Sequence, residues 1–255
     1  MAVTTGGKTE VPDLWISRFG PSGGARTRLV CFPHAGGSSS FFFPLARALA
    51  PDVEVVAVQY PGRQNRRSEP LLTRITDLVD GVLPELDRAG DLPWALFGHS
   101  MGAVVAFEAA RRAARPPLRL FASGRRAPSR IRDEDVHTRD DAGLIAELRR
   151  LGGTDPRVFD EPELLAGLLP AFRADYRAIE TYRPDPGAAV GCPVTVLIGV
   201  EDPQVTEDEA RSWRHHTTDR TDLHVFPGGH FYLADHQRRV TALIAAGLGD
   251  LSAKE

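Results

Sequence analysis

Residues 98–102 read GHSMG and match the pattern G-x-S-x-G. They follow an apolar run at 94–97 and precede small apolar residues at 103–110, an arrangement that predicts a strand, a sharp turn and a helix. Such a turn holds its serine in a strained conformation, and the glycines let neighbouring backbone approach closely. The helix N-terminus adds partial positive charge near the hydroxyl. The pattern favours Ser100 as a nucleophile over an incidental turn serine.

A serine hydroxyl needs a general base, and that base needs a third group to fix its tautomer. His230 follows the sequence PGG directly after the apolar run at 222–226, on a loop at the carboxyl end of the last expected strand. Other downstream histidines fall within an expected strand, helix or insertion: His137, His215, His216, His224 and His236. His99 adjoins the serine on a sharp turn, so we expect its ring to point elsewhere. We expect His230 to be the base.

The acid of such a triad should lie between the serine and the histidine in chain order. Asp202 comes shortly after the apolar run at 194–198 and directly before Pro203, where a loop is expected to begin. The rival acids are Glu201, Asp208 and Asp222, of which Glu201 is the nearest competitor. With Asp202 chosen, all three triad residues lie on loops at one edge of the sheet, and the chain is predicted to be a serine hydrolase.

Acyl transfer also requires hydrogen-bond donors for the oxyanion. One is expected to be the backbone N–H of Met101, directly after the nucleophile. The other is assigned to the N–H of Ala35, in the turn FPHAGG at 32–37. A plain glycine-rich turn is the alternative interpretation of this segment, and His34 is expected to be structural.

The elements that must position these residues alternate along the chain. Strands are expected at 28–32, 53–58, 94–97, 118–122, 194–198 and 222–226. Helices are expected through 45–49 with a cap at 38–40, and at 75–86, 101–114 and 240–248. Strands that are apolar throughout indicate a mostly parallel sheet covered on both faces. The predicted fold class is α/β, an α/β-hydrolase fold with a central sheet flanked by helices.

The segment 133–182 breaks this alternation, because it contains helical stretches at 141–151, 161–169 and 170–182 and no clear strand. Between two strands of an open α/β sheet it would lie near the ligand-binding edge. We expect a helical lid or pocket wall; an extra layer that only stabilises the fold is the alternative. The expected organisation is a mobile N-terminus at 1–12, a core at 13–132 and 183–250, and the lid at 133–182.

Composition excludes several classes of function. The net charge of −3 over 255 residues gives no sign of nucleic-acid or membrane binding, and no apolar run is long enough to span a membrane. No export signal, metal site or nucleotide site is visible. Cys31 and Cys192 adjoin apolar runs and are expected to be buried free thiols, which fits a reducing compartment. We expect a cytoplasmic protein.

Five segments together resemble the stand-alone type II thioesterases of polyketide and nonribosomal peptide biosynthesis. They are CFPHAGGS at 31–38, VQYPGR at 58–63, FGHSMGA at 97–103, GVEDPQV at 199–205 and FPGGHFYL at 226–233. The combination is more specific than G-x-S-x-G alone, and the resemblance runs from about Leu14 to Leu248. The family's triad falls on Ser100, Asp202 and His230, the positions already selected. The resemblance is least informative over the lid and leaves acyl preference open.

The resemblance implies hydrolysis of aberrant or stalled acyl groups from the phosphopantetheine arm of an acyl or peptidyl carrier protein. No cofactor is expected, since the substrate carries the phosphopantetheine, and a monomer is expected. An acidic carrier would need a local basic surface, for which two arginine clusters are candidates: Arg63, Arg66 and Arg67, then Arg125, Arg126, Arg130 and Arg132. Solvated surface arginine is the default interpretation of both clusters.

Three other functions remain open at this stage. A general carboxylesterase or lipase would use the same triad with a different pocket. A catalytically silent hydrolase-fold binding protein would keep the fold alone. An offloading or cyclising thioesterase domain is disfavoured by chain length and by the lack of an attached carrier segment.

Overall fold

The computed structural model describes residues 14–20, 23–88 and 90–252. The N-terminus expected to be mobile, 1–12, lies outside the described residues.

Within the described residues seven strands form one sheet, in the order β1-β3-β2-β4-β5-β6-β7. The strands are β1 (Ile16–Arg18), β2 (Thr27–Phe32), β3 (Val53–Val58), β4 (Trp94–His99), β5 (Leu120–Ser123), β6 (Val194–Gly199) and β7 (Thr221–Phe226). Only β1 pairs antiparallel, with β3, and the other neighbours in this sheet are parallel. The mostly parallel α/β sheet is confirmed, whereas the short edge strand β1 was not predicted.

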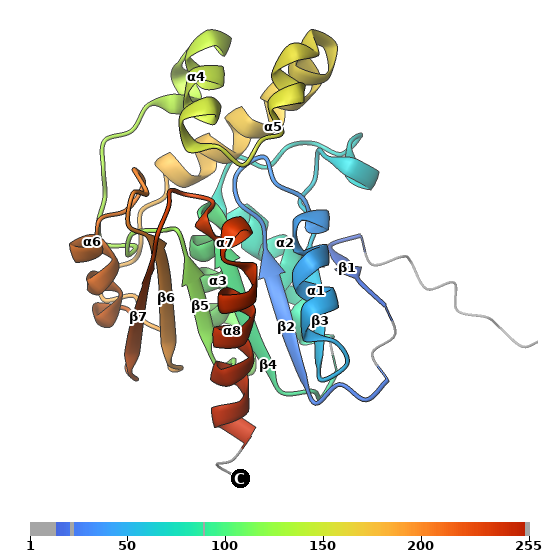
Figure 1. Cartoon of the computed structure of the whole chain (residues 1–255), viewed down its shortest axis with the longest axis vertical. Helices are drawn as coiled ribbons and strands as arrows, with labels where there is room; N and C mark the ends of the chain where they lie inside the picture. The colour runs from blue at the N-terminus through green and yellow to red at the C-terminus, as the bar shows by residue number, and fades with distance from the viewer. Residues whose placement is uncertain (1–13, 21–22, 89, 253–255) are drawn as a thin grey trace, which may run out of the picture.

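Helices cover both faces of the sheet (Figure 1), with α2 and α3 on one face and α1 and α8 on the other. The α-helices are α1 (Phe43–Leu49), α2 (Ile75–Asp87), α3 (Met101–Arg112), α4 (Asp141–Leu151), α5 (Pro162–Glu180), α6 (Glu207–Arg211), α7 (Tyr232–Asp235) and α8 (Gln237–Ser252). Short 3-10 helices are η1 (Ser39–Phe42), η2 (Gln64–Arg66), η3 (Val136–Thr138), η4 (Pro156–Asp160) and η5 (Ser212–His215).

The core sits on both sides of the sheet because successive strand side chains point to opposite faces. On β2, Val30 and Phe32 pack on the side of α2 and α3, while Leu29 and Cys31 pack on the side of α1 and α8. Every residue of β2, β3, β4 and β6 is buried, as strands apolar on both faces require. The sheet is thus a rigid support whose carboxyl edge carries the loops.

The helical insertion, residues 133–182, lies over that carboxyl edge, where Figure 1 shows α4 and α5 above the strands. Two helices were predicted at 161–169 and 170–182, but α5 is continuous through Pro170. Pro170 is exposed, so water can reach the Ala166 carbonyl that the proline leaves without its helical donor. The buried face of α5 continues across the proline and packs on α4 through Leu165, Leu169, Phe172 and Tyr176.

Two local details also differ from expectation. The segment after Ser38 begins as η1 rather than as a capped α-helix, and the Ser38 side chain makes no capping hydrogen bond. β4 extends to His99, so the first two residues of the GHSMG motif belong to the strand. None of the helices in the described part of the chain is both long and apolar enough to cross a membrane.

Candidate active site

Ser100 occupies the turn between β4 and α3, with φ 55° and ψ −120°. A positive φ strains a residue that has a Cβ, and the turn persists because surrounding contacts enforce it. The N–H of Ser100 donates to the carbonyl of Ser123 at 2.8 Å. A Cβ on Gly98 would lie 2.2 Å from the Gly102 oxygen, and one on Gly102 would lie 2.1 Å from the Phe32 oxygen. Both motif glycines are therefore required by close backbone approach.

His230 and Asp202 form a buried pair at the ends of the last two strands. Nδ1 of His230 donates to Asp202, 2.8 Å from Oδ2 and 3.0 Å from Oδ1. The two side chains are 1% and 0% exposed. Oδ1 of Asp202 also accepts the N–H of Gln204 at 2.8 Å. These contacts place the imidazole hydrogen on Nδ1 and leave Nε2 as an acceptor, the tautomer that a general base requires.

The two loops that carry this pair are hydrogen-bonded to each other. The N–H of Val200 donates to the Phe226 carbonyl at 2.8 Å, and the N–H of Glu201 donates to the Gly228 carbonyl at 3.0 Å. The rival acids lie elsewhere: Glu201 is exposed, Asp208 is in α6, and Asp222 in β7 faces Arg119 at 3.3 Å. Among the four candidates only Asp202 contacts His230.

The orientation of the Ala35 N–H follows from the turn that contains it. The N–H of Gly37 donates to the His34 carbonyl at 2.9 Å. Because a trans peptide is planar, the N–H of Ala35 points opposite to that carbonyl, away from the interior of the turn. Ala35 and Ser100 line the same cavity. Met101 is the first residue of α3, so its N–H has no acceptor within that helix. This arrangement is compatible with the two expected oxyanion donors.

A cavity of about 30 Å³ contains Ser100 and His230. The helical insertion builds much of its wall, with Leu148 and Leu151 from α4 and Phe172 and Tyr176 from α5. The other residues that line it are His34, Ala35, Gly152, Thr154 and Phe231. A space of this size holds one or two water molecules, which leaves little room for an acyl chain beside Ser100.

Two further imidazoles surround His230. The ring of His99 lies with its centroid 5.0 Å from that of His230, not pointing elsewhere as predicted, and its Nδ1 lies 2.9 Å from Ser123 Oγ. Burial, and to a lesser degree the neighbouring His230, lowers the pKa of His99 well below its usual range. The same two causes, with Arg63, lower the pKa of His34 to about 3. Both rings are therefore neutral near neutral pH.

The structure buries four of the seven arginines in the two candidate docking clusters, namely Arg63, Arg66, Arg125 and Arg126. Arg66 donates twice to Glu69, at 2.8 and 2.6 Å, and lies over the Trp15 ring. Arg67 remains exposed. A docking contact requires a solvent-facing side chain, so the prediction that these four arginines bind a carrier protein is not supported.

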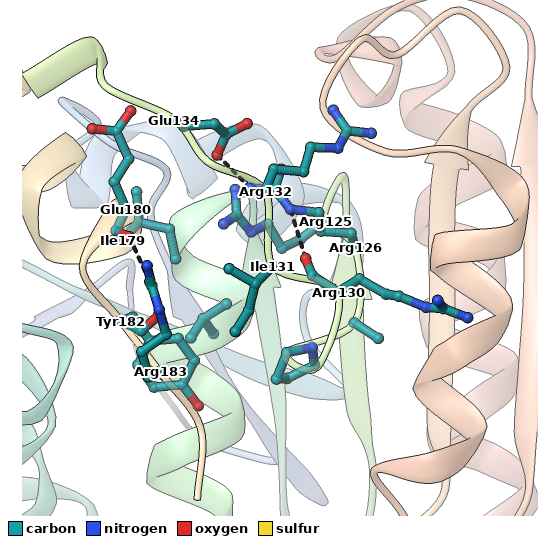
Figure 2. Close-up of a pocket in the computed structure, with 13 residues that line it drawn as sticks. Arg125, Arg126, Arg130, Ile131, Arg132, Glu134, Ile179, Glu180, Tyr182 and Arg183 are labelled. Carbon is teal, nitrogen blue, oxygen red and sulfur yellow. Dashed lines mark hydrogen bonds and ion pairs between the residues drawn. The ribbon is translucent and has the colours of Figure 1, made fainter.

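Arg125 and Arg126 border a second cavity, of about 20 Å³ (Figure 2). There Arg126 pairs with Glu134 and donates to the carbonyl of Arg130. Burial and the adjacent Arg126 lower the pKa of Arg125 to about 9. The outer arginines of this cluster also have partners, Ser212 for Arg130 and Glu209 for Arg132.

Arg126 instead hydrogen-bonds to the loop that carries Asp202, a contact that the sequence did not predict. It donates through Nη1 to the carbonyl of Gln204 at 3.1 Å, and the Gln204 N–H binds Asp202. The Gln204 amide also donates to Glu147 of α4 at 3.2 Å. Gln204 lies in the GVEDPQV segment, but nothing in its spacing indicated these partners. The described residues contain no group of three or more His, Cys, Asp or Glu side chains that could hold a metal ion.

Comparisons with known proteins give matches along nearly the whole chain. The family model for a thioesterase domain matches residues 27–247. A probable cadicidin biosynthesis thioesterase of Streptomyces griseus is 48% identical over 92% of this chain and 66% of its own length, so the chain spans just under two thirds of that relative. Thioesterase PikA5 of Streptomyces venezuelae is 47% identical over 89% of this chain and 83% of its own.

A solved structure supports the same relation. The type II thioesterase BorB from the borrelidin biosynthetic cluster has a TM-score of 0.87 and 48% sequence identity, with 92% of this chain and 98% of that chain covered.

Proposed function

Because this chain belongs to the thioesterase domain family, we propose that it hydrolyses acyl thioesters on the phosphopantetheine arm of carrier proteins through Ser100, His230 and Asp202. The observation that carries the proposal is the buried His230–Asp202 pair, whose histidine lines the same cavity as a serine held at positive φ. The 48% identity to a type II thioesterase of known structure supports the reaction class.

The geometry suggests the following sequence of steps. Nε2 of His230 takes the hydroxyl proton as Ser100 Oγ attacks the thioester carbonyl. The N–H groups of Ala35 and Met101 would stabilise the resulting oxyanion, each by about 3 kcal/mol. Collapse breaks the C–S bond and releases pantetheine thiolate, whose pKa of about 8.5 makes it a good leaving group. The proton on His230 passes to the departing thiolate, which restores the neutral imidazole. His230 then takes a proton from a water molecule as the water attacks the acyl-enzyme, and returns it to Ser100 Oγ as the carboxylic acid is released.

We further propose that the acyl groups removed are short. The wall formed by Leu148, Leu151, Phe172 and Tyr176 leaves a cavity of about 30 Å³ around the serine. An acyl chain of several carbons would require α4 or α5 to move. Removal of short acyl units from blocked carriers is the corresponding physiological role, in a pathway of polyketide or nonribosomal peptide type.

The partner is then an acyl or peptidyl carrier protein. Of the seven arginines in the two candidate clusters, Arg67 and Arg130 have the exposed side chains that a docking contact needs. The buried free thiols of Cys31 and Cys192 support a location in the reducing cytoplasm.

The test compares three substrates that carry the same acyl group on different leaving groups: propionyl carrier protein, propionyl pantetheine and p-nitrophenyl propionate. We expect kcat/KM to be highest for the carrier thioester, with Ser100→Ala inactive on all three. Equal or greater turnover of the nitrophenyl ester, with the carrier left intact, would assign a general esterase instead. Failure of a fluorophosphonate to label Ser100 would favour a catalytically silent binding protein.

A further inference from the structure

Asp175, in the middle of α5, holds the turn that carries Ala35. Its side chain is fully buried. Oδ2 accepts the N–H of Gly36 at 2.7 Å and Nη1 of Arg63 at 2.6 Å, while Oδ1 accepts Nη2 of Arg63 at 2.9 Å. A helix of the insertion is thus hydrogen-bonded directly to the backbone beside the expected oxyanion donor.

Arg63 contacts the same turn from its other side. Its Nη1 donates to the carbonyl of Gly37 at 3.2 Å, in addition to the two bonds to Asp175. The ion pair therefore binds the N–H of Gly36 and the carbonyl of Gly37, two points one residue apart. An unpaired carboxylate near a developing oxyanion would oppose it, and pairing with Arg63 offsets that charge.

Phe172 lies three residues before Asp175, on the same side of α5. A Cβ on Gly36 would lie 2.0 Å from a carbon of the Phe172 ring, and Gly36 has a φ of 72°. The ring that forms part of the cavity wall therefore packs directly on the turn. One face of α5 both encloses the cavity and contacts the turn at Gly36.

We propose that Asp175 is a positioning residue for the oxyanion hole, and that it acts through Gly36. By accepting the N–H of Gly36, Asp175 prevents that N–H from competing for the reacting carbonyl. It also fixes the adjacent peptide, so that the N–H of Ala35 faces the reacting carbonyl. The proposal rests on the proposed function, because it assumes that Ala35 is an oxyanion donor. A buried ion pair that only stabilises the fold is the contrasting account.

Two double variants separate these accounts. Arg63→Gln with Asp175→Asn removes both charges and keeps an oxygen that can accept the Gly36 N–H. Arg63→Gln with Asp175→Leu also removes both charges but offers no acceptor, in a side chain of similar size. The two variants thus differ chiefly in the acceptor at residue 175. Each is measured for kcat and KM on propionyl carrier protein, for the rate of Ser100 labelling by a fluorophosphonate, and for Tm.

We expect the leucine variant to show kcat and labelling rate at least about tenfold below those of the asparagine variant, since loss of one oxyanion donor lowers kcat by about 10²–10³. KM should change little. Equal kcat and equal labelling rates in two folded variants would overturn the proposal, as would a difference confined to KM.

Asp175→Glu provides an independent test if either double variant fails to fold. It keeps the charge and the pairing with Arg63 but moves the acceptor oxygens by one methylene. We expect a lower kcat at unchanged KM, whereas wild-type kcat would contradict the proposal. If the wild type is labelled at Ser100 but leaves carrier thioesters intact, the proposed function fails. The labelling rates of the variants would then still test Asp175.

Discussion

At the scale of single residues, two buried imidazoles surround His230. His34 and His99 lie around it, and burial lowers the pKa of both. Among the described residues, neither ring has a carboxylate partner comparable to Asp202, which accepts twice from Nδ1 of His230. Because burial keeps both rings neutral, they should lower the free energy of unfolding at acidic pH.

His99 should make the folded state less stable at low pH. Below pH ~6.5 the unfolded chain takes up a proton on this imidazole that the native chain does not bind, so the free energy of unfolding falls as the pH falls. The contribution is up to about 1.4 kcal/mol per pH unit. We expect His99→Asn to flatten the dependence of unfolding free energy on pH between 5 and 6.5, as measured by urea denaturation.

The exposed His215 gives the matched control, because His215→Asn also removes one imidazole. A change of slope in the His99 variant that the His215 variant does not share would assign the effect to His99 and not to the loss of any imidazole. An unchanged slope in the His99 variant would show that His99 binds a proton in the folded protein.

At the scale of elements, the helical insertion is hydrogen-bonded to the loop that carries Asp202 and to the turn that carries Ala35. Glu147 of α4 accepts from Gln204, whose backbone binds Asp202. Asp175 of α5 binds Gly36, next to Ala35. The insertion therefore does more than cover the cavity, since α4 contacts the loop of Asp202 and α5 contacts the turn of Ala35. Substitutions of residues that line the cavity should change acyl selection, whereas substitutions of residues that contact the two loops should change catalytic geometry.

Leu148 should limit acyl chain length. It lines the cavity beside Ser100, while Leu144, one turn earlier on α4, is equally part of the insertion's core but lies outside the cavity lining. Both Leu→Ala changes should destabilise the protein by about 2–5 kcal/mol. We expect only Leu148→Ala to raise kcat/KM for hexanoyl relative to propionyl carrier protein, by severalfold. The same shift in both variants would mean that loosening of the insertion, and not cavity size, sets the preference.

At the scale of the whole molecule, the sequence predicted what depends on local pattern. The bounds of β3 and α4 agree with the expectation, because an apolar run interrupted only by Glu54 and an amphipathic period each specify one element. The pairing of His230 with Asp202 followed from loops at one sheet edge. Arg63 was interpreted as a surface residue, since its partner Asp175 is 112 positions away and only the folded chain brings them together.

The two cysteines should report global unfolding. Cys31 is fully buried, and Cys192 is 3% exposed; burial raises the pKa of the Cys31 thiol, and burial with the nearby Asp219 raises that of Cys192 to about 11. Thiolates are the reactive species, so a disulfide reagent should modify neither cysteine in the native protein and both in urea. Rapid modification of native Cys192 would show local opening at the start of β6.

The most direct test of the central claim is the hydrolysis of propionyl carrier protein by the wild type and by Ser100→Ala, followed by intact mass of the carrier. The account predicts that the wild type returns the free phosphopantetheine thiol, while the variant leaves the propionyl group in place at the rate of spontaneous hydrolysis. Equal release by the folded variant would contradict a serine acyl-enzyme mechanism. An intact propionyl carrier with both proteins would contradict this thioesterase function.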